Sequence, residues 1–158
     1  MDNTLAAAAA ALESIYGKAS AAGFGSAVFH GPLAPGTTAE QEALRVYQAF
    51  LGEQWKAREA DWKRGWKTLY DESAGSAKNV DAVLKAVSDP ASRASVELLT
   101  TLLDNPDAAL QALRGAYERP DLSAKGLYAI GDGEAMSGVI MAGTFQSGYA
   151  ITVVALMD

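Results

Sequence analysis

The sequence predicts an α+β fold with about five helices, one of them a long central helix, and a C-terminal three-stranded antiparallel β-meander packed on them. Three observations support this expectation. Helical periodicity persists from Thr38 to about Tyr70, helix-capping residues precede several shorter apolar stripes, and beyond about Lys125 the apolar pattern becomes that of strands. For 158 residues we expect a single domain over 1–158, with a helical part at about 1–120 and a β part at about 125–158.

The predicted central helix carries every tryptophan of the chain. Thr38 and Gln41 have the spacing of a capping box at its start. At helical periodicity the indoles fall on one narrow apolar line, formed by Trp55, Trp62 and Trp66. A continuous helix here would span roughly 50 Å, which exceeds the width of a compact domain of this size. We therefore expect a kink at Gly52 or Gly65, or a helix that projects and packs on something outside its own core.

Basic residues flank the aromatic line on the same predicted helix. They form a stripe of Arg45, Lys56, Lys63 and Lys67, with Arg64 beside it. Either the tryptophans are core and the lysines are solvated, or the stripe meets an anionic partner such as nucleic acid or an acidic protein surface. The whole chain has a net charge of −6, which repels phosphate backbones. Pairing with the chain's own acidic helices is therefore the simplest use of the stripe, and nucleic acid is disfavoured.

Shorter elements are expected on both sides of the central helix. Before it, 4–22 is predicted to be a helix, and the glycine- and proline-rich segment 24–37 a linker in which 27–29 forms a short strand or packs into the core. After it, capping residues open three helices at about 79–88, 90–104 and 106–118. The caps are Asn79, Asp89 before Pro90, and Asn105 before Pro106.

Three C-terminal strands are expected, at about 126–131, 138–145 and 149–157. The two longer strands are apolar on both faces, which is unusual for a small antiparallel sheet. One face should pack on the helices. The other face needs cover from the N-terminal helix, from the linker or from a second subunit.

Residues suited to catalysis are few. The chain has no cysteine, which excludes disulfides and thiolate catalysis and suits a cytoplasmic location. His30 is the only histidine, and no spacing of other ligands indicates a metal site. Dinucleotide-loop, P-loop and nucleophile-elbow motifs are absent, so an enzyme is disfavoured and no cofactor is expected. No apolar run approaches the ~20 residues that cross a membrane.

Three functional hypotheses follow from these patterns. The first is a non-catalytic protein-binding module or small homo-oligomer that uses the aromatic line, the basic stripe and the apolar sheet, with another copy of the chain or another protein as its partner. The second is a small-molecule-binding protein or enzyme with a pocket between the sheet and the helices. Its lining would be Trp55, Trp62, Trp66, Tyr128 and Tyr149, with His30 nearby. The third is nucleic-acid binding through the basic stripe.

Overall fold

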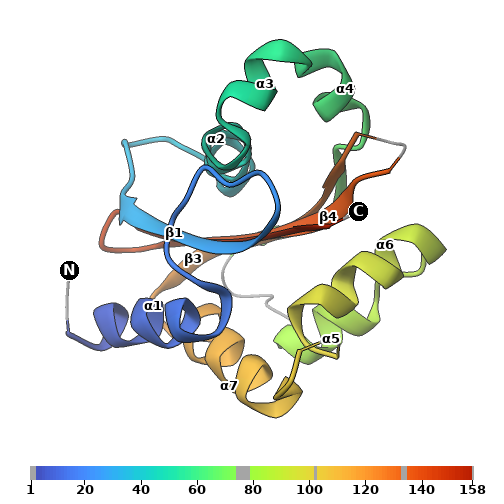
Figure 1. Cartoon of the computed structure of the whole chain (residues 1–158). Coiled ribbons are helices and arrows are strands. Elements are labelled where there is room, and N and C mark those ends of the chain that lie inside the picture. The colour runs from blue at the N-terminus through green and yellow to red at the C-terminus, as the bar shows by residue number, and fades with distance from the viewer. Residues whose placement is uncertain (1–2, 74–78, 102, 133–134, 158) are drawn as a thin grey trace.

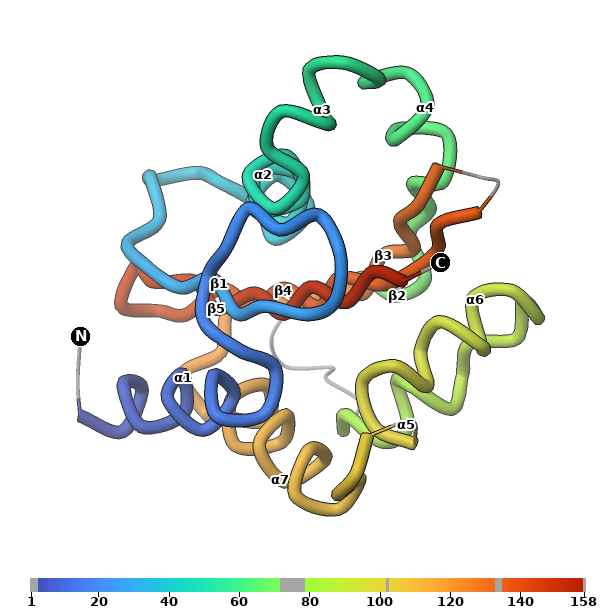
Figure 2. The backbone as a smooth tube through the Cα atoms, viewed as in Figure 1, coloured from blue at the N-terminus to red at the C-terminus, as the bar shows by residue number. Residues whose placement is uncertain are grey.

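The computed structural model describes residues 3–73, 79–101, 103–132 and 135–157. At its centre lies one five-stranded antiparallel sheet in the spatial order β1-β5-β4-β3-β2 (Figure 1). The strands are β1 (Gly25–Pro32), β2 (Lys67–Ser73), β3 (Leu122–Gly131), β4 (Ser137–Phe145) and β5 (Tyr149–Met157). Helices lie on both faces of the sheet, so the molecule has three layers (Figure 1, Figure 2).

The expected fold class is wrong in its numbers of strands and helices, although the structure does mix helices and strands. The sheet has five strands rather than three, and the described residues contain seven α-helices rather than about five. Strands β3, β4 and β5 do pair as consecutive antiparallel neighbours. The two further strands lie in the part of the chain expected to be mainly helical, although a short strand at 27–29 was one of two alternatives and β1 contains it. Helices and strands are therefore not segregated along the sequence.

The edge strands β1 and β2 depend on partners that are distant in the sequence. β1 pairs with β5, and it occupies most of the segment expected to be a linker. β2 pairs with β3, with a bulge between Thr68 and Tyr70. The segment that forms β2 also continues the helical spacing of Trp62 and Trp66, which is why it was assigned to the end of a helix. Pairing with a neighbouring strand outweighs that local pattern.

The long central helix is also a wrong expectation, because the chain breaks it twice. Its three pieces are α2 (Ala39–Leu51), α3 (Glu53–Ala57) and α4 (Glu59–Arg64). Gly52 ends α2 at φ 56°, a conformation that residues with a Cβ rarely adopt. Arg58, at φ −141°, separates α3 from α4. The kink expected at Gly52 is thus a full break, and α3 and α4 turn back above the sheet instead of projecting (Figure 1).

The predicted helix starts are confirmed where a capping residue marks them. Thr38 and Gln41 form the expected capping box, in which the Gln41 amide donates to Thr38 Oγ1 at 3.1 Å. The opposite layer contains α1 (Asn3–Tyr16), α5 (Val80–Lys85), α6 (Pro90–Val96), a short 3-10 helix (Glu97–Leu99) and α7 (Pro106–Tyr117). Asn79, Asp89 and Asn105 accept hydrogen bonds from the first turns of α5, α6 and α7.

The sheet separates two apolar cores. Helices α1, α5, α6 and α7 pack on one face, against side chains such as Met141, whereas α2, α3 and α4 pack on the other, against side chains such as Ile140 (Figure 2). Every residue over 138–145 of β4 and over 150–156 of β5 is buried. Helices of the same chain therefore cover both faces of the two central strands.

Little apolar surface lies outside these cores. Among the described residues, the exposed large apolar side chains are Phe24 and Met157. Within the same part of the chain, no helix combines the length and the apolar character needed to cross a membrane.

Candidate functional site

The three tryptophans gather around one buried tyrosine, Tyr47 of α2. The Tyr47 ring makes edge contacts with Trp55 and Trp62, at centroid distances of 5.4 and 6.5 Å, and stacks with Trp66 at 6.0 Å. Its hydroxyl donates to the Trp62 carbonyl at 2.9 Å and accepts from the Gly131 amide at 3.1 Å. Burial raises the pKa of Tyr47 to about 12, so this hydroxyl keeps its proton at neutral pH.

Each indole N–H has an acceptor within the chain. The acceptors are Glu59 Oε1 for Trp55, the Gln54 carbonyl for Trp62 and Glu40 Oε2 for Trp66, at 3.1, 3.1 and 3.0 Å. Trp55 and Trp62 are buried, with 7% and 3% of their surface exposed, whereas Trp66 is half-buried. Trp55 and Trp62 therefore belong to the core, and Trp66 is the indole that also borders solvent.

The basic residues do not form one stripe, because the helix expected to carry them is broken. Arg45 lies on α2, Lys56 on α3, Lys63 on α4 and Lys67 on β2. Three of them pair with acids one turn away: Arg45 with Glu42, Lys56 with Glu53 at 3.6 Å, and Lys63 with Glu59 at 3.7 Å. Positive charge in this region is therefore offset locally by the helices' own carboxylates.

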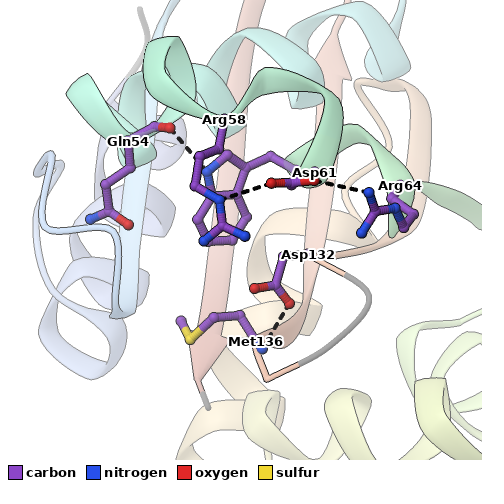
Figure 3. A network of polar contacts seen from close by, with 7 residues as sticks. Gln54, Arg58, Asp61, Arg64, Asp132 and Met136 are labelled. Carbon is purple, nitrogen blue, oxygen red and sulfur yellow. Dashed lines mark hydrogen bonds and ion pairs between the residues drawn. The ribbon is translucent and has the colours of Figure 1, made fainter.

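Further polar side chains lie near α3, α4 and the end of β3. Figure 3 shows Asp61 between two arginines, with Arg58 Nε at 2.8 Å and Arg64 Nη2 at 2.9 Å. The hydrogen bond from Arg58 is the main cause that lowers the pKa of Asp61. Nearby, the buried Asp132 accepts from the Met136 amide at 3.0 Å. The two arginines and two aspartates together carry no net charge. This balance favours a structural role for these side chains over the binding of a charged ligand.

An open groove of about 400 Å³ runs between α2 and Trp66. It is lined by Glu40, Gln41 and Leu44 of α2, by Lys63 of α4 and by Trp66. We call it the Trp66 groove. Leu44 and Trp66 supply its apolar surface, and Glu40 and Lys63 bring charges of opposite sign to it. Of the candidates from sequence, the groove brings together Lys63 and Trp66.

Tyr128 of β3 extends the aromatic cluster next to this groove. Its ring stacks on Trp66 with a centroid distance of 5.1 Å and an interplanar angle of 14°. The Tyr128 hydroxyl is fully buried and has no hydrogen-bond partner among the described residues. Burial raises the pKa of Tyr128, and the nearby carboxylates of Asp71 and Glu40 raise it further. An unmet hydrogen bond therefore lies close to two acidic side chains.

His30 and Tyr149 lie on the other face of the sheet, next to α1. The Tyr149 hydroxyl is 2.7 Å from His30 Nδ1, and His30 Nε2 is 3.6 Å from Glu13 Oε2 of α1. Burial, and then the charge of Glu13, raise the pKa of Tyr149. Because the sheet lies between the two groups, the structure does not bring His30 and Tyr149 into one pocket with Trp66.

One buried polar residue, Lys125, could not have been found from sequence. Lys125 of β3 is buried in the core on the α1 side, where its Nζ donates to the Tyr117 carbonyl at 3.2 Å. A lysine in a strand is ordinarily expected on a solvent-exposed surface, and only the packing of α7 against β3 places it inside.

No cluster of three or more metal-ligating His, Asp or Glu side chains occurs in the described part of the chain.

A second groove, of about 350 Å³, lies between α5, α6 and α7. Its rim carries charges of both signs, and two of them, Asp81 and Lys85, pair at 2.9 Å. None of its lining residues contributes a buried polar atom without a partner. No aromatic side chain lines this second groove, whereas Trp66 lines the first one, so the second groove is the weaker candidate for a binding site.

Comparison of the chain with models of known protein families, with curated proteins and with solved structures gives no match. Inferences about function therefore depend on the geometry of these sites.

Proposed function

We propose that the protein is a non-catalytic binding module that holds an extended segment of a partner protein in the Trp66 groove. The observation that carries this proposal is the position of Trp66, which alone among the three indoles borders solvent and lines an open groove with Leu44. Large aromatic side chains at the centre of a contact supply much of the binding energy of protein interfaces. We also propose a cytoplasmic location, which the absence of cysteine supports.

The shape and lining of the groove favour a protein segment over a small molecule. Small-molecule sites bury most of the ligand in a concave cavity, whereas the Trp66 groove is open to solvent. Its lining side chains contain no hydroxyl, thiol or imidazole, so the commonest nucleophiles are absent, and its ionisable side chains are Glu40 and Lys63. These features support binding rather than catalysis.

The charge distribution favours a protein partner over nucleic acid. Arg45, Lys56 and Lys63 are paired with acids of their own helices, so the groove has no basic surface to follow a phosphate backbone. The net charge of −6 adds long-range repulsion.

A second copy of the chain is the alternative partner, and a different surface supports it. Phe24 precedes β1 and Met157 ends β5, and their exposed fractions are 55% and 36%. Because Gly25 pairs with Leu156, Phe24 and Met157 are adjacent at one end of the β1–β5 pair. A small homo-oligomer built on this patch would dissociate on dilution, whereas the affinity for a foreign segment would not depend on the concentration of this chain.

The proposed groove can be tested with peptides selected against the folded protein from a displayed random library. We expect Leu44→Lys to weaken the selected peptides at least about tenfold, because it replaces the apolar side chain in the middle of the groove with a charge. Ala49→Lys is the matched control, since it adds the same charge at an exposed position of α2 that does not line the groove. Calorimetric titration gives the Kd values. Selected peptides that bind both variants as tightly as the original protein would contradict the proposal.

A further inference from the structure

The Trp66 groove ends at a corner where two carboxylates lie near the Trp66–Tyr128 stack. Glu40 Oε2 accepts from Trp66 Nε1 at 3.0 Å and from Thr68 Oγ1 at 3.4 Å. Asp71 pairs with Gly126 across the β2–β3 ladder, so its side chain lies on the same face of the sheet as Tyr128. Within the described part of the chain, neither Glu40 nor Asp71 makes an ion pair. We call Glu40, Asp71 and Tyr128 the acidic corner.

The Tyr128 hydroxyl is aimed into this corner. A Cβ placed on Gly126 would collide with the hydroxyl, so the phenol lies over Gly126, the residue directly opposite Asp71. Glycine at this position is what allows the ring to lie there. The hydroxyl is fully buried and has no partner in the described residues. Because buried polar groups in native proteins are almost always paired, this unmet bond is an observation independent of the two carboxylates.

The other charged residue that lines the groove is Lys63. Its positive charge is already partly offset within the chain. Lys63 Nζ is 3.7 Å from Glu59 Oε1 and 5.9 Å from the centroid of the Trp55 ring. Glu40, in contrast, accepts only from neutral donors among the residues that the structure describes, namely the Trp66 indole and the Thr68 hydroxyl. The uncompensated charge of the groove is therefore negative, and it lies at the acidic corner.

We propose that the acidic corner binds the cationic end of a lysine or arginine side chain on the partner segment, an inference that rests on the proposed function of the Trp66 groove. The two carboxylates supply the charge that complements the cation. The unmet Tyr128 hydroxyl, which is fully buried in the unbound protein, accepts a hydrogen bond from the same cation once binding displaces the side chains that cover it. Leu44 and Trp66 then contact the apolar residues beside the basic one.

The test uses defined peptides and the three indole N–H signals of the folded protein in two-dimensional NMR spectra. Acetyl-Leu-Lys-Leu-amide is compared with the same peptide carrying norleucine in place of lysine, which keeps the methylene chain and removes the charge. A third peptide carries arginine. We expect the lysine and arginine peptides to shift the Trp66 indole signal and to bind up to about fivefold tighter than the norleucine peptide, the effect of an exposed ion pair.

Single substitutions show which residues cause the preference for the lysine peptide over the norleucine peptide. Glu40→Gln, which keeps an acceptor for the indole, and Asp71→Asn should each reduce the lysine-over-norleucine preference, and Tyr128→Phe should reduce it too. Glu53→Gln is the matched control, because it removes the same charge from a 91% exposed side chain on α3. It should leave the preference unchanged. The dispersion of the same spectra shows whether each variant is folded.

The outcomes separate this inference from the proposed function. If all three peptides shift the Trp66 signal with equal Kd, the acidic corner does not bind the cation, although the groove still binds a segment. If the lysine preference survives both Glu40→Gln and Asp71→Asn, the cation binds elsewhere and the inference is overturned. If no peptide shifts the Trp66 signal, both the inference and the proposed use of the groove are overturned.

Discussion

Tyr47 and Tyr128 are two fully buried tyrosines on the same face of the sheet, and their hydroxyls are placed very differently. The Tyr47 hydroxyl bonds to the Trp62 carbonyl and the Gly131 amide, so it ties α4 to the end of β3. The Tyr128 hydroxyl has no partner among the described residues. A buried polar group that stays unpaired lowers stability, so the Tyr128 hydroxyl should contribute nothing favourable to folding in the unbound protein.

Removing each hydroxyl should therefore have opposite consequences for stability. We expect Tyr47→Phe to lower the free energy of unfolding by about 1–3 kcal/mol, because it leaves buried backbone groups of Trp62 and Gly131 without this partner. Tyr128→Phe should change it by less than about 0.5 kcal/mol or raise it, since no bond is lost. Urea unfolding followed by circular dichroism measures both. A cost for Tyr128→Phe as large as that for Tyr47→Phe would mean that the Tyr128 hydroxyl is already satisfied.

At the residue scale, the sequence identified part of the candidate site. Lys63 and Trp66 were candidates because of their helical spacing, and both line the groove. The position of Asp71 near Tyr128 was not predicted, because it depends on the pairing of β2 with β3, which the helical spacing of Trp62 and Trp66 conceals. The hydrogen bond from Trp66 to Glu40 also has no sequence signal, because it joins residues that are 26 positions apart.

At the element scale, the break at Gly52 decides where the aromatic side chains lie. A continuous helix would carry Trp62 and Trp66 away from the sheet. With breaks at Gly52 and Arg58, α3 and α4 fold back, and both indoles reach Tyr47. The site is thus a consequence of a helix that ends early.

Two glycine-to-alanine substitutions separate this break from an ordinary helical glycine. We expect Gly52→Ala to lower the free energy of unfolding by about 1–3 kcal/mol, because φ 56° with ψ −124° is strained for a residue with a Cβ. Gly115→Ala in α7 should raise it by about 0.5–1 kcal/mol, since an added Cβ there meets nothing within 4 Å and alanine favours helix. Thermal and urea unfolding test both variants. A Gly52→Ala variant as stable as the original protein would show that the break does not require glycine.

Elements with local signals were predicted from sequence, and elements stabilised by distant partners were not. Asn79 and Asn105 cap helices within one turn, so their positions followed from spacing alone. The edge strands β1 and β2 are ordered by β5 and β3, which are far away in the chain. Neither periodicity nor propensity contains that information.

At the scale of the whole molecule, helices of the same chain bury the apolar strand residues for which the sequence suggested an outside partner. β4 and β5 are apolar on both faces because a helical layer covers each face (Figure 1). Apart from the Trp66 groove, the exposed large apolar side chains among the described residues are Phe24 and Met157. A stable interface buries at least about 1,200 Å², which is more than two side chains supply. The structure thus favours a chain whose own helices cover its sheet, with Trp66 as the indole that borders solvent.

The most direct test of this account is the solvent accessibility of the three indoles in the isolated protein. NMR spectra of the indole N–H groups, recorded with a soluble paramagnetic agent before and after strong dilution, measure it for each tryptophan separately. We expect the Trp66 signal to broaden while Trp55 and Trp62 stay protected, with the same pattern at both concentrations. Broadening of Trp55 and Trp62 to the same extent as Trp66, or protection that is lost on dilution, would contradict the claim that one chain covers its own sheet and leaves Trp66 at the surface.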